Sequence, residues 1–115
     1  MPYIKARTIF FVGTYEKKVT AILSELERRS AENEISANPW RWPIIPGTGG
    51  VRKARVRRGN RGRSGGVRIA YFYWPSKETI FFLSAYAKNE KSDLSGRDKK
   101  DLKVIVKLLI GGRDG

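Results

Sequence analysis

The run GTGGVRKARVRRGNRGRSGGVRIAYFYW, residues 47–74, alternates apolar and basic side chains on either side of a glycine-rich centre. It lies inside residues 35–77, which carry ten Lys or Arg and no Asp or Glu. The whole chain has 24 basic and 11 acidic residues and a formal net charge of +13, so its basicity is concentrated in this stretch. A single-sign patch of this density attracts polyanions, and nucleic acid is the commonest polyanion in a cell.

The alternation within this run predicts two strands joined by a hairpin loop. Residues 51–57 place Lys53, Arg55 and Arg57 on one face of the first strand, because successive side chains of a strand point to opposite faces. Residues 58–66, with repeated Gly, Asn and Ser, predict the loop. Residues 67–74 form the second strand, and residues 79–87 a third after the turn at Pro75.

Two helices and a further strand complete the expected order. A β-branched and aromatic stretch, residues 8–12, predicts the first strand. A helix over residues 14–31 follows from its apolar stripe: Val19, Ile22, Leu23 and Leu26. A last helix begins at Ser95, with Asp98 three residues on as a capping-box partner. The order β-α-β-β-β-α predicts one α+β domain over residues 1–115, with helices on one face of a small, largely antiparallel sheet.

The strand faces separate a core from a basic surface. We expect the core face to consist of these six residues: Val67, Ile69, Tyr71, Phe81, Leu83 and Ala85. The opposite face then gathers the following side chains: Lys53, Arg55, Arg57, Arg68, Tyr86 and Lys88. Burying unpaired arginines is costly, and residues 35–77 contain no acid to pair with them. Solvent or an anionic ligand must therefore face this surface.

Composition excludes several kinds of site. The chain has no Cys and no His, so disulfides, ordinary zinc sites and Ser-His-Asp triads are absent, and we expect no metal or cofactor. The glycine-rich segment 46–50 lacks the order of a nucleotide-binding P-loop. The apolar runs are too short for a signal peptide or for the roughly 20 residues of a membrane span, which predicts a cytoplasmic protein with no membrane partner.

Three ordered motifs resemble a known family. They are IPGTGGVRKARV at residues 45–56, GRSGGVRIAYFY at 62–73 and IFFLSAYAKNEKSDLS at 80–95. With the preceding strand and helix, they resemble the HigB branch of the RelE/ParE superfamily of type II toxins over about residues 8–110. The resemblance implies a RelE-like fold and messenger-RNA cleavage on the ribosome, at the decoding region of the 16S rRNA. It also implies neutralisation by a cognate antitoxin, expected to be of helix-turn-helix type.

The resemblance also assigns residues to the site. Matched positions give the candidate catalytic residues Lys53, Arg55, Arg68, Tyr86 and Lys88. The candidate RNA-binding residues are Arg52, Arg57, Arg58, Arg61 and Arg63. RelE has a tyrosine shortly after the last strand, where residues 90–95 of this chain have no aromatic, so Tyr86 is the candidate to replace it. The 2′-hydroxyl of RNA can attack the adjacent phosphate, so cleavage needs no histidine.

Roles for these residues follow from their chemistry. Arg55 and Arg68 suit phosphate contact and stabilisation of transition-state charge. Lys53 is the candidate general base and Lys88 the candidate acid for the leaving oxygen, whereas Tyr86 is expected to stack on a base or donate a proton. Two alternatives stay open on the sequence alone. One is a ParE-like inhibitor of DNA gyrase, and the other is a nucleic-acid-binding module without catalysis.

Overall fold

The computed structural model describes residues 6–58, 66–91 and 93–111. Its main elements are β1 (Thr8–Phe11), α1 (Tyr15–Ile22), α2 (Glu25–Ala37), β2 (Arg52–Val56), β3 (Val67–Trp74), β4 (Thr79–Ala87) and α3 (Gly96–Val106). A 3-10 turn (Pro75–Lys77) links β3 to β4, and one π-helical segment (Lys107–Gly111) extends α3. No helix in the described ranges combines the length and apolar character that crossing a bilayer requires.

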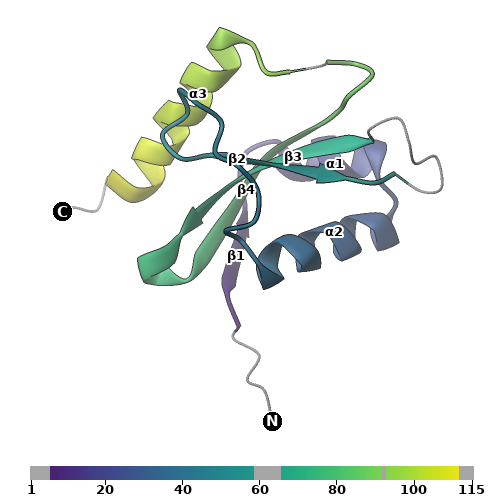
Figure 1. Cartoon of the computed structure of the whole chain (residues 1–115), viewed down its shortest axis with the longest axis horizontal. Coiled ribbons are helices and arrows are strands. Elements are labelled where there is room, and N and C mark those ends of the chain that lie inside the picture. The colour runs from purple at the N-terminus through teal and green to yellow at the C-terminus, as the bar shows by residue number, and fades with distance from the viewer. Residues whose placement is uncertain (1–5, 59–65, 92, 112–115) are drawn as a thin grey trace.

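The four strands form one sheet in the order β1-β4-β3-β2. The pairs β2–β3 and β3–β4 are antiparallel, and β1 pairs with β4 in parallel. This confirms the predicted α+β class, but the helices lie on both faces of the sheet instead of one (Figure 1). The reason is that β3 and β4 are apolar on both faces, with seven of eight and eight of nine residues buried, so each face needs a cover.

A β-bulge divides the long pair of strands. Ala70 pairs with Ser84 while Tyr71 pairs with Phe82, which leaves Leu83 without a partner on β3. A bulge of one residue reverses the facing of every side chain beyond it. The predicted core face is therefore wrong for Phe81 and Leu83, which pack under α3. Ala85 lies, as predicted, in the same core cluster as the β3 residues Val67, Ile69 and Tyr71.

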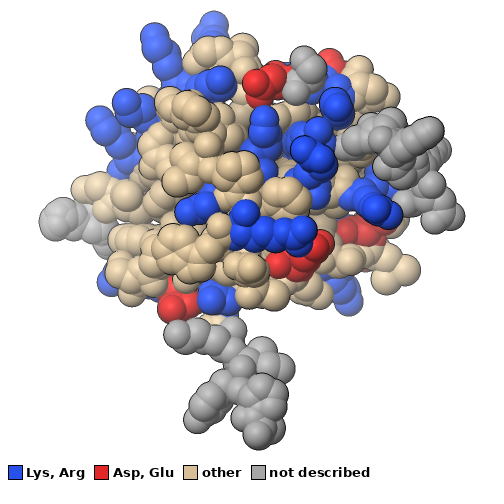
Figure 2. Space-filling view, in the orientation of Figure 1, with Lys and Arg blue, Asp and Glu red and all other residues tan. Residues whose placement is uncertain are grey.

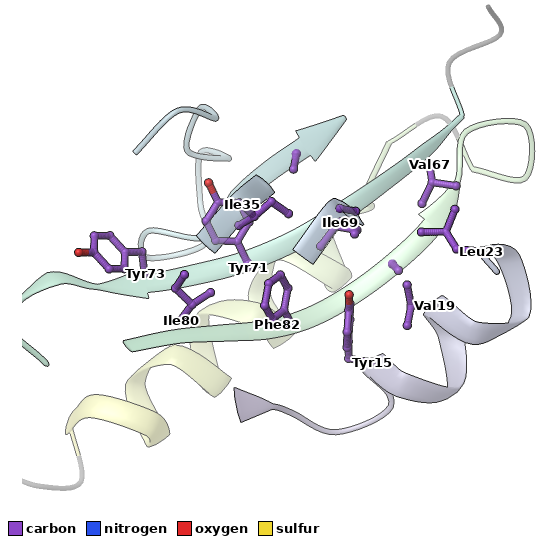
Figure 3. Close-up of a cluster of buried hydrophobic side chains, with 13 residues drawn as sticks. Tyr15, Val19, Leu23, Ile35, Val67, Ile69, Tyr71, Tyr73, Ile80 and Phe82 are labelled. Atoms are coloured by element: carbon purple, nitrogen blue, oxygen red, sulfur yellow. The ribbon is translucent and has the colours of Figure 1, made fainter. Parts of the chain in front are cut away.

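The core beneath α1 and α2 is built around aromatic rings (Figure 3). Tyr15 of α1 lies 5.3 Å from Phe82 of β4 between ring centroids. Its hydroxyl donates to Glu32 of α2 at 2.7 Å, and the Arg28 guanidinium donates to the same carboxylate at 2.7 Å. Burial, with the nearby Glu32, raises the pKa of Tyr15. These contacts join α1 to α2 over the sheet.

The helix predicted over residues 14–31 is in fact two helices. Leu23 is extended at the end of α1, and Ser24 begins α2 with a capping box: its side chain accepts from the Glu27 N–H, and Glu27 accepts from the Ser24 N–H. The S-x-x-E signature is present in the sequence, but the apolar spacing continues through it. Satisfying the first N–H groups of α2 favours the break at this point.

The opposite face of the sheet is covered by α3. Leu102 and Val106 of α3 belong to a second core cluster, which also contains Phe72 of β3 and Phe81 of β4. The helix begins as predicted, because Ser95 and Asp98 form a reciprocal capping box. The Lys91 ammonium lies 3.0 Å from the Asp98 carboxylate. The backbone N–H of Ser95, followed by Lys91, lowers the pKa of Asp98 to about 2.

We predict that Ile69→Ala lowers the free energy of unfolding by about 2–5 kcal/mol, because it leaves a cavity in the core where this side chain is fully buried. Urea denaturation followed by circular dichroism measures the loss. Leu26→Ala is the control, since Leu26 is 77% exposed and should change stability by about 0.5 kcal/mol or less. Equal losses in the two variants would contradict the assigned core.

A second prediction concerns the cap of α3. Because the folded-state pKa of Asp98 is depressed, its contribution to stability is present above its unfolded pKa of about 4 and is lost as pH falls towards about 2. Carboxyl-detected NMR should show Asp98 titrating near pH 2. Lys91→Met should raise this pKa but leave it below the ordinary value, because the Ser95 N–H remains. An unchanged midpoint in Lys91→Met would contradict the contact.

Candidate nucleic-acid interface

Three predicted residues form a row across the sheet. Arg55 of β2 stands opposite Arg68 of β3, and Arg68 stands opposite Tyr86 of β4. Side chains of directly opposed residues share one face, with Cβ atoms about 5 Å apart. Tyr86 belongs to the cluster under α3, so the row lies on the α3 side of the sheet. The predicted grouping of these residues on one face is confirmed.

Exposure falls along this row. Arg55 is exposed, whereas Arg68 and Tyr86 each retain 8% of their accessible surface. The Tyr86 hydroxyl is buried and has no hydrogen-bond partner within the described part of the chain. Burial raises the pKa of Tyr86; the Asp93 charge adds to the rise and the Arg68 charge opposes it. The phenol is therefore protonated at neutral pH and can donate a hydrogen bond.

Lys53 lies next to the row and contacts an acid. It is opposite Ala70, and its ammonium is 3.4 Å from the carboxylate of Asp93 in the link between β4 and α3. The Leu94 N–H donates to the same carboxylate oxygen at 2.8 Å, and this bond is the main reason that the pKa of Asp93 is lowered. Sequence reasoning missed Asp93. The only available signal was an acid between the last strand and its capped helix.

The same link covers Tyr86. The Lys91 ammonium lies 5.8 Å from the centroid of the Tyr86 ring, and Leu94 packs in the same cluster. Stacking of a base on this ring would require Lys91 to move. The hydroxyl is buried as well, so a ligand that enters from the open end of the row reaches it only if the cover over Tyr86 shifts.

The other basic residues are distributed around the row. Lys88 is exposed immediately after β4, and its N–H donates to the Gly66 carbonyl, so strand alternation continues and places it on the face of Tyr86. Arg57 is exposed and Arg58 half-buried just beyond β2. Arg61 and Arg63 lie outside the described residues.

Arg52 is not brought together with this group. It pairs with Tyr71, whose side chain lies in the cluster under α1 and α2, on the opposite face of the sheet. Its guanidinium donates to the Trp42 carbonyl at 2.6 Å and lies 5.4 Å from the centroid of the Trp40 ring. These contacts give Arg52 a structural place in the loop before β2.

Figure 2 shows Lys and Arg outnumbering Asp and Glu on the face that Figure 1 presents, including the area over β2 and β3. Among the residues that the structure describes, no group of three or more Asp, Glu, His or Cys could hold a metal ion. The arrangement combines fixed cations with a buried proton donor. It can bind a phosphate and place a hydrogen-bond donor beside it.

Comparison with known proteins identifies the family. A family model described as the RelE toxin of the RelE/RelB toxin–antitoxin system matches residues 47–114. The fold matches the E. coli RelBE toxin–antitoxin complex (TM-score 0.52, 19% identity, 70% of this chain and 94% of that one). It also matches a free mutant of E. coli toxin RelE (TM-score 0.54, 18% identity, 76% and 90%). A third match is the RelBE2 complex of Mycobacterium tuberculosis (TM-score 0.51, 19% identity, 70% and 90%).

The structural matches have low sequence identity and establish the fold alone. The family model, by contrast, spans more than half of the chain and includes β2, β3, β4 and α3, the elements that carry the row and its cover. On the strength of that match, this chain belongs to the RelE toxin family.

Proposed function

We propose that this toxin is an endoribonuclease that cleaves messenger RNA on the translating ribosome. The observation that carries the proposal is the row Arg55, Arg68 and Tyr86, which sets two guanidinium groups beside a buried phenol on one face of the sheet. In RNA cleavage the 2′-hydroxyl attacks the adjacent phosphate, and negative charge grows on the phosphate and on the leaving oxygen. Fixed cations and a proton donor meet both needs.

Each residue has a role in this proposal. Arg68, held by burial, contacts the scissile phosphate, and exposed Arg55 guides the strand to it. The protonated Tyr86 hydroxyl donates to a phosphate oxygen or to the leaving oxygen. Lys53 already binds a carboxylate, so we assign it a phosphate contact in preference to the role of general base, and water takes the proton of the attacking 2′-hydroxyl. Lys88 remains the candidate acid for the leaving oxygen.

The outer basic residues serve binding. Arg57 and Arg58 continue from β2 towards the hairpin loop, where the sequence also places Arg61 and Arg63. We propose that these four contact the RNA backbone of the message and of the 16S decoding region, since phosphate contacts fix position without chemistry. A cognate antitoxin, which we expect to be of helix-turn-helix type, would neutralise the toxin. Within the superfamily, the motif order favours the HigB branch.

The first test is brief induction of the chain in a bacterium, followed by mapping of new RNA 5′ ends. Cuts within translated codons are expected. Arg68→Ala should reduce cleavage by about 10²–10³-fold, the usual effect of removing one donor to transition-state charge. Arg29→Ala is the matched control, because the Arg29 side chain is 67% exposed on α2 and pairs with Glu25 at the surface. DNA damage without cut messages would instead indicate gyrase inhibition, and RNA binding without cuts a binding module.

The second test separates proton donation by Tyr86 from stacking. Tyr86→Phe keeps the ring and removes a hydroxyl that has no hydrogen-bond partner among the described residues, so the free energy of unfolding should stay the same or rise. If the hydroxyl donates, cleavage of ribosome-bound message should fall by about 10²-fold or more in single-turnover assays. Full activity in Tyr86→Phe combined with loss in Tyr86→Ala would show that the ring alone matters.

A further inference from the structure

A groove lies between α2 and the end of the edge strand β2, and its volume is about 590 Å³. Leu26, Ser30 and Glu34 line one wall. Because they are spaced four residues apart on α2, they lie along one face of the helix over about 12 Å. The loop after α2 and the last residues of β2 form the other wall. Figure 1 shows β2 ending on the side of the molecule where α2 begins.

One end of the groove carries a planar cation and a carboxylate. The Arg41 guanidinium lies 4.7 Å from the centroid of the Trp42 ring, and both residues line the groove. Its Nη1 donates to the Glu34 carboxylate at 3.1 Å. The side chains of Arg41 and Glu34 are 52% and 61% exposed, so each has surface left for a ligand. Bases stack on guanidinium planes, and a carboxylate has lone pairs for further donors.

The opposite end of the groove is cationic. β2 starts at Arg52, whose guanidinium donates to the Trp42 carbonyl at 2.6 Å, and the chain then extends to Arg57 over about 16 Å. Arg57 therefore lines the end of the groove that is remote from Trp42, and Arg55 lines it as well. Both side chains are exposed, and neither forms a hydrogen bond or an ion pair with a described residue.

These features follow one another in the same order as the parts of a nucleotide. Two exposed guanidinium groups at one end suit a phosphate. The lining also includes Ala31 and Val56, which offer apolar contact to a ribose or a base. At the other end, stacking on Arg41 places the edge of a base beside Glu34. The volume of about 590 Å³ lies within the usual range of small-molecule pockets, about 300–1,000 Å³.

Glu34 discriminates between bases. Its carboxylate accepts hydrogen bonds and donates none, so it fits an exocyclic amino group such as N4 of cytosine. Uracil has a carbonyl oxygen at that position, and the two electron-rich oxygens repel each other. The charge of this residue therefore favours bases with an amino group over uracil.

We propose that this groove binds a nucleotide whose base carries an exocyclic amino group, with its phosphate on Arg55 and Arg57 and its base on Arg41 beside Glu34. The source of the nucleotide rests on the proposed function: it belongs to the message, next to the cleavage site. Arg55 is part of both the groove and the row, so a chain with a phosphate at Arg55 extends into both. The groove thereby gives cleavage a preference for the neighbouring base.

The test titrates the full chain, labelled with ¹⁵N, with CMP and with UMP. The two nucleotides share the phosphate and the ribose, and they differ in the amino or carbonyl group at C4 and in the proton on N3. Amide shifts are expected at residues 30, 34, 41 and 55–57, and CMP should bind about fivefold or more tightly than UMP. Equal affinities, or shifts confined to other surfaces, would overturn the proposal.

Variants at the base end test the two contacts separately. Glu34→Gln keeps the shape of the side chain and adds an amide that donates to a carbonyl oxygen, so CMP and UMP should bind within about twofold of each other. Glu25→Gln is the matched control and should keep the preference of the parent chain. Glu25 is also an exposed acid of α2 in an ion pair, but it does not line the groove.

Arg41→Ala removes the stacking surface and should weaken binding of both nucleotides about tenfold. Arg29→Ala removes a charge from α2 outside the groove and should bind both within about twofold of the parent. The amide spectrum of each variant shows whether it is folded. Parent-like preference in Glu34→Gln, or parent-like affinity in Arg41→Ala, would contradict the proposed contacts.

Trinucleotides distinguish a message from a free nucleotide. UpCpU should bind about tenfold or more tightly than CMP and should also shift the amides of Arg68 and Tyr86, because its second phosphate reaches the row. UpUpU should bind more weakly than UpCpU. If CMP binds as tightly as UpCpU and the row stays unshifted, the ligand is a free nucleotide, which overturns the assignment to the message.

These outcomes are separate from those of the nuclease test, because the titrations contain no ribosomes and measure no cleavage. A chain that cuts messages but binds CMP and UMP equally would disprove the base site and leave the nuclease standing. A chain that prefers CMP but cuts no message would leave the nucleotide site standing and disprove the proposed nuclease activity.

Discussion

The antiparallel pairing of β3 with β4 is the constraint on which the other parts of the structure depend. It joins eight residues of β3 to β4 and supplies buried side chains to both faces of the sheet. Burial of both faces forces helices onto both sides. On one side α1 and α2 cover the sheet; on the other, α3 covers the half beyond the bulge, where Phe72 and Phe81 lie. The half before the bulge carries Arg68 and Tyr86, beneath the link that leads into α3.

The bulge explains which sequence predictions succeed. Arg55, Arg68 and Tyr86 lie between the hairpin and the bulge, where uninterrupted alternation assigns faces correctly. Leu83 is the unpaired residue of the bulge, and Phe81 lies beyond it. Both side chains therefore lie on the face opposite to the one that alternation predicts. Nothing local in an apolar run such as residues 79–83 marks the extra residue, because either facing buries an apolar side chain. The position of the bulge is a property of the paired strands and of the helices that cover them.

Long-range polar contacts were beyond sequence reasoning for a different reason. Asp93 meets Lys53 across 40 positions of sequence, and its neighbour Leu94 packs in the cluster under α3. Arg52 illustrates the converse. Its basic character suggested RNA binding, yet its strand position directs it to the carbonyls of Trp40 and Trp42 in the loop before β2. Charge identified the right segment of the chain, and register decided which charges face a ligand.

Burial of the Tyr86 hydroxyl affects both the stability of the fold and the binding of a ligand at the row. A buried hydroxyl without a partner costs about 1–3 kcal/mol, and phenylalanine would fill the same space at position 86 without that cost. Within the described residues the Tyr86 hydroxyl makes no hydrogen bond that would stabilise the fold. An anionic ligand would supply the missing acceptor, and it would also interact with the neighbouring guanidinium of Arg68, which a low-dielectric setting strengthens. The strand pairing fixes the order of these groups, so a phosphate that reaches the row meets the guanidinium of Arg68 beside the phenol of Tyr86.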